Sequence, residues 1–445
     1  MVDCGGSLNG EHGDGQAKAE FLPIMFGEEL MEGMREFKRI WDPENRMNPG
    51  KVIDGYRVDE NLRMGPRYKV VKMPTRMNFR SPEGDGFQRA IEHCVGMGRC
   101  RSGKANTMCP SYRATKDERF STRGRSRLLW EMLQGDVLKD GWTSEAVKEG
   151  LDTCLACKGC RSDCPTHTDM ASYKAEFLSH YYEKHMRPRQ ALTMGRIGDW
   201  APLAGKLPWL ANLMTQTPGL SAIAKLVGGV APERDMPKFA PKTFRQLDKK
   251  RSKGATTQRK VILWVDTFCE YFHPEVATAA VEVLGHAGFE AVLPATPLCC
   301  GRPLYDFGYI DLAREKLRKT LDVVGRQMEE DANAPVAVVG LEPGCMSVFK
   351  DELLKLFPDD PRAKRLASSV SLLGDFLNDN GYRPPPLEST YWCMRTAIRS
   401  LCSAPRAIPR CSRRWARKRP ISIAAVAAWP ARSASTRSTS RSRRP

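Results

Sequence analysis

The sequence lacks any run of eighteen apolar residues, so none of its 445 residues is predicted to lie in a membrane-spanning helix. It also lacks a signal-peptide pattern at Met1. Its 15 cysteines are clustered within a long chain, whereas secreted disulfide frameworks are small and cysteine-dense throughout. These features predict a reducing, cytoplasmic location and cysteines that bind metal. Peripheral contact with the inner face of the membrane stays open.

Acidic residues are absent from residues 391–445. Thirteen Arg and one Lys give this segment +14 of the net charge of +18, which leaves +4 for the other 390 residues. Basic arms that bind nucleic-acid phosphates have such a charge, but they seldom contain the three Trp and three Cys found here. We therefore predict no nucleic-acid partner.

The chain is long enough for two or three domains. A glycine-rich start and a helical pattern mark residues 1–58, and the clustered cysteines fall in residues 82–185. Residues 186–258 are rich in Pro, Gly and apolar side chains, and we expect irregular helices that pack between domains. An amphipathic surface that docks on a membrane or a quinone is the alternative.

Residues 259–380 show an α/β pattern. Short apolar runs predict strands at Val261–Val265, Glu290–Leu293 and Val336–Val339, and helices are expected between them, including Pro274–His286. This alternation implies a parallel sheet, so the predicted fold class is α+β multidomain, a helical module followed by an α/β domain. Four cysteines follow predicted strands, where open α/β sheets gather their sites: Cys269, Cys299, Cys300 and Cys345.

The most specific motif is a run of four cysteines, Cys154, Cys157, Cys160 and Cys164, followed by Pro165. Their C-x2-C-x2-C-x3-C-P spacing is typical of two-cluster ferredoxins, in which three thiolates hold one [4Fe-4S] cluster and the fourth reaches the other cluster. A zinc site would use two pairs of cysteines instead. The run predicts an electron-transfer protein.

An earlier run supplies the partner but is one thiol short. Cys94, Cys100 and Cys109 occupy the first, third and fourth positions, and Met97 stands in the second. Crossed ligation then predicts one complete [4Fe-4S] cluster held by Cys109, Cys154, Cys157 and Cys160. The other cluster would have Cys94, Cys100 and Cys164, which suits either a [3Fe-4S] cluster or a [4Fe-4S] cluster with another ligand.

The adjacent His93 is a candidate for that extra ligand, with simple solvation as the alternative. Met97 is expected to pack rather than to bind iron, because a thioether is a weak, neutral donor. Four cations flank the cysteines: Arg99, Arg101, Lys158 and Arg161. They either raise a cluster's potential by favouring its reduced form or are ordinary surface charges.

Cys299, Cys300 and Gly301 resemble the CCG signature of the cysteine-rich domain found in heterodisulfide reductase and in the iron-sulfur subunits of anaerobic glycerol-3-phosphate dehydrogenase and glycolate oxidase. The resemblance makes Cys269 the leading and Cys345 the trailing cysteine, and it implies redox or metal chemistry at all four. In that family two CCG repeats usually face each other. Codons can be chosen for Tyr391–Leu401 and Ala424–Thr436 that, when translated in a neighbouring reading frame, encode parts of a second CCG repeat. We therefore expect residues 391–445 to be a frameshifted segment.

The glycine-rich segment around Glu11 and His12, with the later Asn48-Pro49-Gly50, is similar to the end of the FAD-linked oxidases of the vanillyl-alcohol-oxidase fold. The resemblance implies that His12 is the base or orienting group at a substrate hydroxyl. It makes Glu11 a ligand of a divalent metal and puts Asn48 near flavin or substrate. Residues 1–58 would be the remnant of such a domain, and FAD would bind only if the rest of the flavin domain is supplied.

These observations favour the iron-sulfur electron-transfer portion of a flavin-dependent D-2-hydroxy-acid dehydrogenase of the D-lactate, D-2-hydroxyglutarate or glycolate type. Electrons would pass from FAD through the clusters to a quinone or another acceptor. One alternative is a non-catalytic carrier subunit that partners a separate flavoprotein. Another is a thiol redox protein like heterodisulfide reductase, which would need a second CCG motif in frame.

Overall fold

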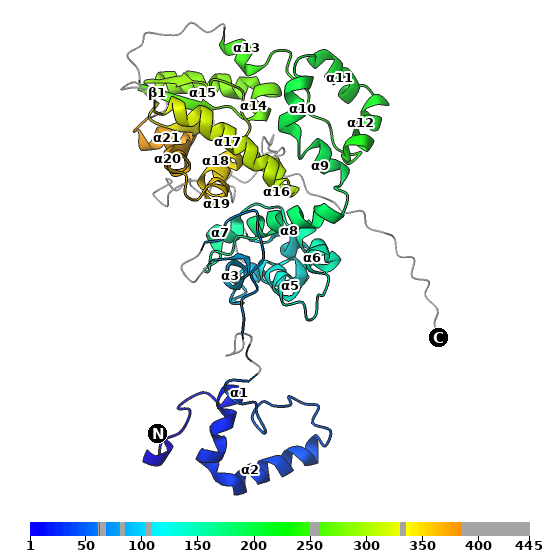
Figure 1. Cartoon of the computed structure of the whole chain (residues 1–445), viewed down its shortest axis with the longest axis vertical. Helices are drawn as coiled ribbons and strands as arrows, with labels where there is room; N and C mark the ends of the chain where they lie inside the picture. Colours follow the sequence, from blue (N-terminus) through cyan, green and yellow to red (C-terminus); the bar gives the residue numbers. More distant parts are fainter. Residues whose placement is uncertain are drawn as a thin grey trace, which may run out of the picture. The chain divides into compact units, whose positions relative to one another are not determined.

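The computed structural model describes residues 1–60, 62, 68–80, 85–103, 108–249, 259–329 and 335–383 (Figure 1). The chain divides into two compact units, residues 1–70 and 71–445, and each is described by itself. The basic segment 391–445 and its predicted frameshift lie outside the described residues. Within the described part of the chain, no helix is both long and apolar enough to cross a bilayer.

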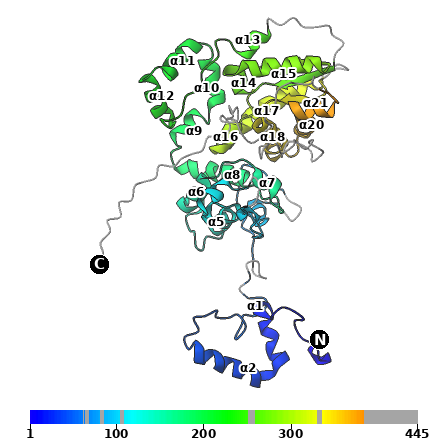
Figure 2. The same cartoon turned by 180° about the vertical axis from the view of Figure 1, so that it is seen from behind.

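Residues 1–70 are organised around one long helix, drawn in blue in Figures 1 and 2. Its core is small, because Ala19, Leu22 and Met31 are the buried apolar side chains among this unit's described residues. Gly27 kinks the long helix with φ of 76°, a left-handed conformation that glycine adopts without a steric penalty. The elements are η1 (Val2–Cys4), α1 (Gly15–Lys18), η2 (Ala19–Phe21) and α2 (Leu22–Trp41), where η marks a 3₁₀ helix.

The second unit begins with a helical module that contains both cysteine runs. Its last helix is almost wholly buried, and its aromatic residues Tyr173 and Phe177 pack among Phe79, Phe87 and Trp142. The elements are α3 (Phe87–Glu92), η3 (Arg99–Arg101), α4 (Pro110–Thr115), η4 (Glu118–Phe120), α5 (Thr122–Gln134), η5 (Gly141–Thr143), α6 (Glu145–Asp152), α7 (Gly159–Asp163) and α8 (Met170–Lys184).

Five further helices follow the module: α9 (Arg189–Thr193), α10 (Ile197–Ala204), α11 (Pro208–Gln216), α12 (Leu220–Gly228) and α13 (Phe244–Asp248). Helix α10 buries Ile197 and Ala201 in a cluster with Phe239 and Phe272, as expected of packing between domains. Helix α11 buries no residue. This segment is therefore helical, and only part of its apolar surface is covered.

The rest of the second unit is built on a parallel sheet of four strands in the order β2-β1-β3-β4. The strands are β1 (Arg259–Trp264), β2 (Phe289–Val292), β3 (Val338–Gly340) and β4 (Val370–Leu372). The helices are α14 (Thr267–Tyr271), α15 (Pro274–His286), α16 (Arg302–Asp306), α17 (Ile310–Gln327), α18 (Pro343–Lys350), α19 (Glu352–Leu356), α20 (Pro361–Ser369) and α21 (Leu373–Asp379). A helical and α/β fold with a small parallel sheet is thus confirmed, and the short strand β4 was not predicted.

Both faces of the sheet are covered, as the apolar strand pattern predicts. Along β1, Val261 and Leu263 face a core that includes residues of α15 and α21. Ile262 and Trp264 belong to the opposite core, which includes residues of α17, α18 and α20. That second core is continuous with the cysteine-rich helical module, where it includes Phe177 of α8. The module and the α/β domain therefore share one hydrophobic core.

Candidate redox site

The structure brings Cys164 of the second cysteine run next to two cysteines of the first run. Cys94, Cys100 and Cys164 line one cavity, together with backbone and side chains of the loop between Cys94 and Cys100. Met97 also lines it, but its side chain is two-thirds exposed, at 67%. The expectation that Met97 packs is therefore wrong. His93 is not among the residues that line this cavity.

Local contacts affect the thiols of this cavity in different ways. The Thr166 hydroxyl lies 3.3 Å and the Thr168 hydroxyl 3.7 Å from the Cys164 Sγ. Burial alone would raise the pKa of the Cys164 thiol, but these hydrogen bonds lower it. At Cys94, by contrast, burial dominates and raises the thiol pKa.

Cys109 lies beside Cys100 at the start of α4. Its Sγ accepts the backbone N–H of Thr122 at 2.9 Å and lies 2.8 Å from the Thr122 hydroxyl. A hydrogen bond with Cys109 is the main cause that lowers the pKa of Cys100 to about 6. The assignment of Cys109 to the cluster of the second run stays a prediction.

The second run lies on a tight loop that leads into α7. Cys154 and Cys157 are partly exposed, and Cys160 is buried. Burial raises the pKa of the Cys160 thiol, and the neighbouring thiols Cys154 and Cys157 raise it further. Such thiols release their protons when they bind iron.

The donor set fits iron-sulfur groups better than a single metal ion. Among the described residues, no three His, Cys, Asp or Glu side chains are grouped so that they could hold one ion. In a four-iron cube each thiolate binds its own iron, so the ligands need not converge on one point. All twelve described cysteines are free of disulfides, which leaves their thiols available.

The cysteines of the CCG motif form a second group of neighbouring thiols, at the carboxyl ends of the strands. The Sγ atoms of Cys300 and Cys345 are 2.9 Å apart, and Cys299 is hydrogen-bonded to Cys300. The hydrogen bond with Cys300 favours the Cys345 thiolate, but burial together with the nearby Asp266 and Glu342 outweighs it, and the pKa of Cys345 rises to about 11. Cys269, on α14, lies in the other core, where burial and Asp266 raise its pKa.

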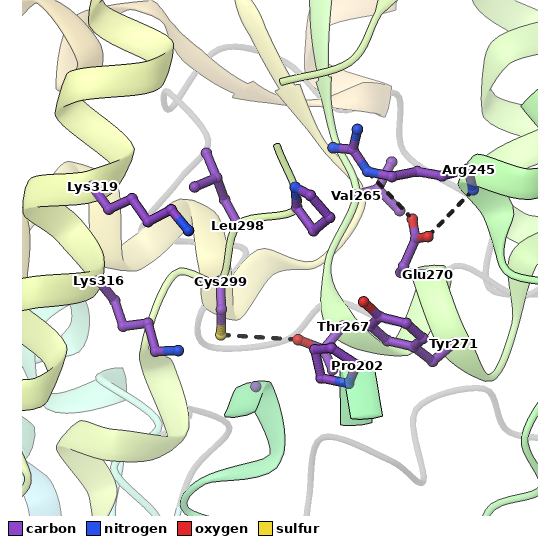
Figure 3. Close-up of a pocket in the computed structure, with 12 residues that line it drawn as sticks. Pro202, Arg245, Val265, Thr267, Glu270, Tyr271, Leu298, Cys299, Lys316 and Lys319 are labelled. Carbon is purple, nitrogen blue, oxygen red and sulfur yellow. Dashed lines mark hydrogen bonds and ion pairs between the residues drawn. The ribbon is translucent and has the colours of Figure 1, made fainter. Parts of the chain in front are cut away.

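Cys299 also lines a cavity that the sequence motifs did not predict (Figure 3). The Thr267 hydroxyl lies 3.9 Å from the Cys299 Sγ, and Lys316 and Lys319 extend from α17 toward the same space. Arg245 and Glu270 lie on the other side. The three-residue spacing of the two lysines on one helix face was the available sequence signal.

Of the four cations beside the cysteines, only Lys158 is fully buried. Its ammonium group contacts three carboxylates, those of Asp169, Asp351 and Glu352. The interpretation of Lys158 as a surface charge is therefore wrong. Its three carboxylate partners carried no signal in the sequence.

The flavin-type residues of the first unit lie at its surface. The side chains of His12 and Glu11 are 93% and 88% exposed, and the His12 Nε2 lies 3.9 Å from the Glu11 Oε2. Asn48 follows a turn in which Asp42 accepts the backbone N–H groups of Arg46 and Met47 at 2.8 and 2.9 Å. The roles of Glu11, His12 and Asn48 stay predictions, since these exposed groups need further ligands or substrate contacts from elsewhere.

Two regions of the chain match known protein families. Residues 1–52 match the family of FAD linked oxidases, C-terminal domain, and residues 90–168 match the 4Fe-4S dicluster domain. D-2-hydroxyglutarate dehydrogenase of Escherichia coli (strain K12) is 27% identical over 402 residues, which cover 78% of this chain and 38% of that protein. The protein of the same name from Pantoea ananatis is 26% identical, with the same coverage.

A second group of relatives is similar over a shorter stretch. Lactate utilization protein A of Bacillus subtilis is 32% identical over 122 residues, which cover 26% of this chain and 48% of that protein. No solved structure matches the chain. The chain thus spans little more than a third of the D-2-hydroxyglutarate dehydrogenases it matches. The predicted resemblance to FAD-linked hydroxy-acid dehydrogenases with an iron-sulfur module is confirmed.

Proposed function

We propose that this chain is the iron-sulfur electron-transfer portion of a flavin-dependent D-2-hydroxy-acid dehydrogenase. The substrate class rests on the resemblance to D-2-hydroxyglutarate dehydrogenases, and D-lactate or glycolate is the alternative substrate. Oxidation of a 2-hydroxy acid removes two electrons as hydride together with the hydroxyl proton. Bound iron-sulfur clusters supply the chemistry for passing such electrons onward to a quinone or another acceptor.

The observation that carries the proposal is the cavity shared by Cys94, Cys100 and Cys164. The first and third cysteines of one run meet the fourth cysteine of the other run, as crossed ligation requires. If these thiols were only structural, there would be no reason for Cys94 and Cys164, 70 residues apart, to line the same cavity. In the proposal, these three thiols hold the cluster that lacks a fourth cysteine, and Cys109 completes the set of Cys154, Cys157 and Cys160.

The first unit is proposed to complete a flavin domain. Leu30, Phe37 and Trp41 are separated by seven and four residues, so they lie on one side of α2, and each is more than half exposed. Large exposed apolar surfaces of this kind mark contact with another protein part. In the complete site His12 would accept the substrate's hydroxyl proton, a role suited to imidazole near neutral pH, and Glu11 would bind a divalent metal.

The acceptor side is proposed at the CCG motif. The cavity beside Cys299 is lined by Lys316, Lys319 and Arg245, so its cations suit an acceptor that carries or gains negative charge. Trp209 of α11 and Leu226 of α12 are about two-thirds exposed, at 66% and 67%. These apolar side chains support contact with a membrane surface, where a quinone would be found.

Anaerobic purification with iron and sulfide analysis tests the proposal. We expect iron for two clusters and an EPR signal in the reduced chain. Cys164→Ser should remove the cluster of the shared cavity, while Cys4→Ser, a change at an exposed cysteine, should not. A chain that binds no iron and sulfide after reconstitution would exclude the proposed function.

The source of the flavin requires a separate experiment. The gene would be sequenced on both sides, and the chain would be purified from its own host. A flavin domain encoded immediately upstream supports the fused dehydrogenase. A separate flavoprotein that co-purifies with the chain supports a carrier subunit instead.

A further inference from the structure

The loop of the second cysteine run is held in an unusual backbone conformation. Ala156 and Lys158, which flank Cys157, have φ of 48° and 56°, in the left-handed region that residues with a Cβ seldom adopt. Both residues are buried. Strained residues of this kind persist only where the surroundings hold them. Lys174 of α8 donates a hydrogen bond of 2.7 Å to the Cys154 carbonyl oxygen, and the other contacts that hold this loop come mostly from the α/β domain.

Arg302 holds the backbone of Ala156. Its Nη2 donates a hydrogen bond of 2.5 Å to the Ala156 carbonyl oxygen, across 146 residues of sequence. Its Nη1 donates one of 2.8 Å to Glu352 Oε1. Arg302 begins helix α16, two residues after Cys300, so one side chain joins the CCG motif to the cysteine loop.

Lys158 holds the loop from its other side. Its side chain is completely buried, and its Nζ lies 2.8 Å from Glu352 Oε1 and 3.6 Å from Asp169 Oδ2. It also donates a hydrogen bond to Asp351 Oδ2. Asp351 and Glu352 lie where α18 ends and α19 begins, so two of the three carboxylates belong to the α/β domain.

The surrounding charges are balanced across the two domains. Arg161 Nη1 lies 3.0 Å from Asp351 Oδ1, and Lys355 contacts Asp169 and donates a hydrogen bond of 2.7 Å to the Ser172 hydroxyl. Arg302 also lies 3.5 Å from Asp306. In the module, Lys158 and Arg161 share the single carboxylate Asp169, so Asp351 and Glu352 of the α/β domain supply the remaining negative charge that their burial requires.

We propose that Arg302, Lys158, Asp351 and Glu352 form a clamp by which the α/β domain positions the second cysteine run and sets the reduction potential of the iron-sulfur group bound there. Arg302 is a positioning residue, since it acts through the Ala156 backbone and through its charge. The proposal rests on the proposed function for the bound group. It goes beyond that function by making the α/β domain a part of the cluster site.

The two signs of charge in the clamp give a test that a purely structural role would not pass. Arg302→Gln removes a positive charge near the loop, which disfavours the more anionic reduced state and should lower the potential. Glu352→Gln removes a negative charge and should raise it. We expect a change of about tenfold in the reduction equilibrium each way, or about 59 mV for a one-electron couple, measured by EPR-monitored redox titration.

The controls separate charge from packing. Arg302→Lys keeps the positive charge, so its reduction potential should lie close to that of the native chain. This variant replaces Arg302→Gln in the comparison with Glu352→Gln if Arg302→Gln does not fold. Arg365→Gln removes a half-exposed arginine paired with Glu329 at 2.9 Å and should leave the potential unchanged. Equal potentials in all variants, or shifts of the same sign for Arg302→Gln and Glu352→Gln, would overturn the proposal.

Alkylation of the iron-free chain distinguishes failure of the clamp from failure of the proposed function. If the clamp holds the loop, Cys157 should react about tenfold faster with iodoacetamide in Arg302→Gln than in the native chain, since local opening exposes it. The absence of iron in the native chain would exclude the proposed function but leave this measurement possible. Equal alkylation rates in the native chain and both Arg302 variants would exclude the clamp.

Discussion

The two cysteine runs have similar spacings, but the protein holds them in different ways. In the first run Val95 and Met97 are 66% and 67% exposed, and the loop is contacted by Arg123 of the same module, 3.4 Å from the Gly96 carbonyl oxygen. In the second run Ala156 and Lys158 are buried and contact residues of the α/β domain. The first loop is thus supported locally, whereas the second also depends on a distant part of the chain.

This difference separates the consequences of mutation in the two runs. A new side chain at Met97 meets solvent and a cavity, so the first loop can accept a change. A substitution among the charged residues around Lys158 leaves a buried charge without one of its partners. The second loop and its neighbours therefore do not accept such a change. The predictions below test this contrast.

The largest effect is expected from Cys160→Ala. It removes a buried thiol in the middle of the second run, and we expect the loss of the whole cluster bound there, so that the iron content falls to that of one cluster. Iron and acid-labile sulfide per chain measure this. The matched control is Cys4→Ala at an exposed cysteine, and iron equal to the native content in Cys160→Ala would contradict the assignment.

The next effect concerns the buried charges. Asp351→Ala removes one of the three carboxylates around Lys158, together with one partner of Arg161 and of Lys355. It should lower the free energy of unfolding by about 3–5 kcal/mol, the usual result of removing one member of a buried ion pair. Urea denaturation followed by circular dichroism measures it. Asp359→Ala, at an exposed ion pair with Arg80, should change the stability little. Similar losses in both variants would refute the contrast.

A smaller and more specific effect is expected at the first run. Met97→Cys restores the missing thiol in a loop that lines the shared cavity, so a three-iron cluster there should gain its fourth iron. The EPR signal of the oxidised chain, which a [3Fe-4S] cluster produces, should then disappear. Met97→Ala should leave that signal as it is in the native chain. If the signal persists in Met97→Cys, the fourth position does not lie at Met97.

The smallest effect is a pH dependence of stability. Burial alone would raise the pKa of Asp351, but Lys158 and Lys355 outweigh it and lower the pKa below the usual 3.8. A carboxylate with a lowered pKa stabilises the fold above its unfolded pKa, and this contribution is lost as the pH falls through its folded pKa. Thermal unfolding between about pH 5 and 2 should therefore show a smaller loss of stability in Asp351→Asn than in the native chain. Parallel curves would refute this contribution.

The sequence predicted the local parts of this protein well. The apolar run at Val261–Val265 forms the central strand β1, and the predicted helix Pro274–His286 has those bounds in the structure. Both follow from short-range patterns of side-chain polarity. Strand β4, Val370–Leu372, escaped prediction because it is short and contains the polar Ser371, whereas the equally short β3 ends a continuous apolar run.

Part of the candidate site could also be predicted. Cysteine spacing led to the crossed set of Cys94, Cys100 and Cys164, which share a cavity in the structure. The clamp could not be predicted, since Lys158 and Asp351 are separated by 193 residues and charged residues are common throughout the chain. Position in the sequence does not tell which of many charges will be buried together.

The sequence by itself determined the kind of redox module that the chain carries, because its cysteine spacing is that of a 4Fe-4S dicluster domain. Only the tertiary structure decided how each set is supported, because the contacts of Arg302 with Ala156 and of Lys158 with Glu352 exist only after two domains have formed one core. Burial then makes these contacts matter, since a charge removed from water depends on its partners far more than an exposed one.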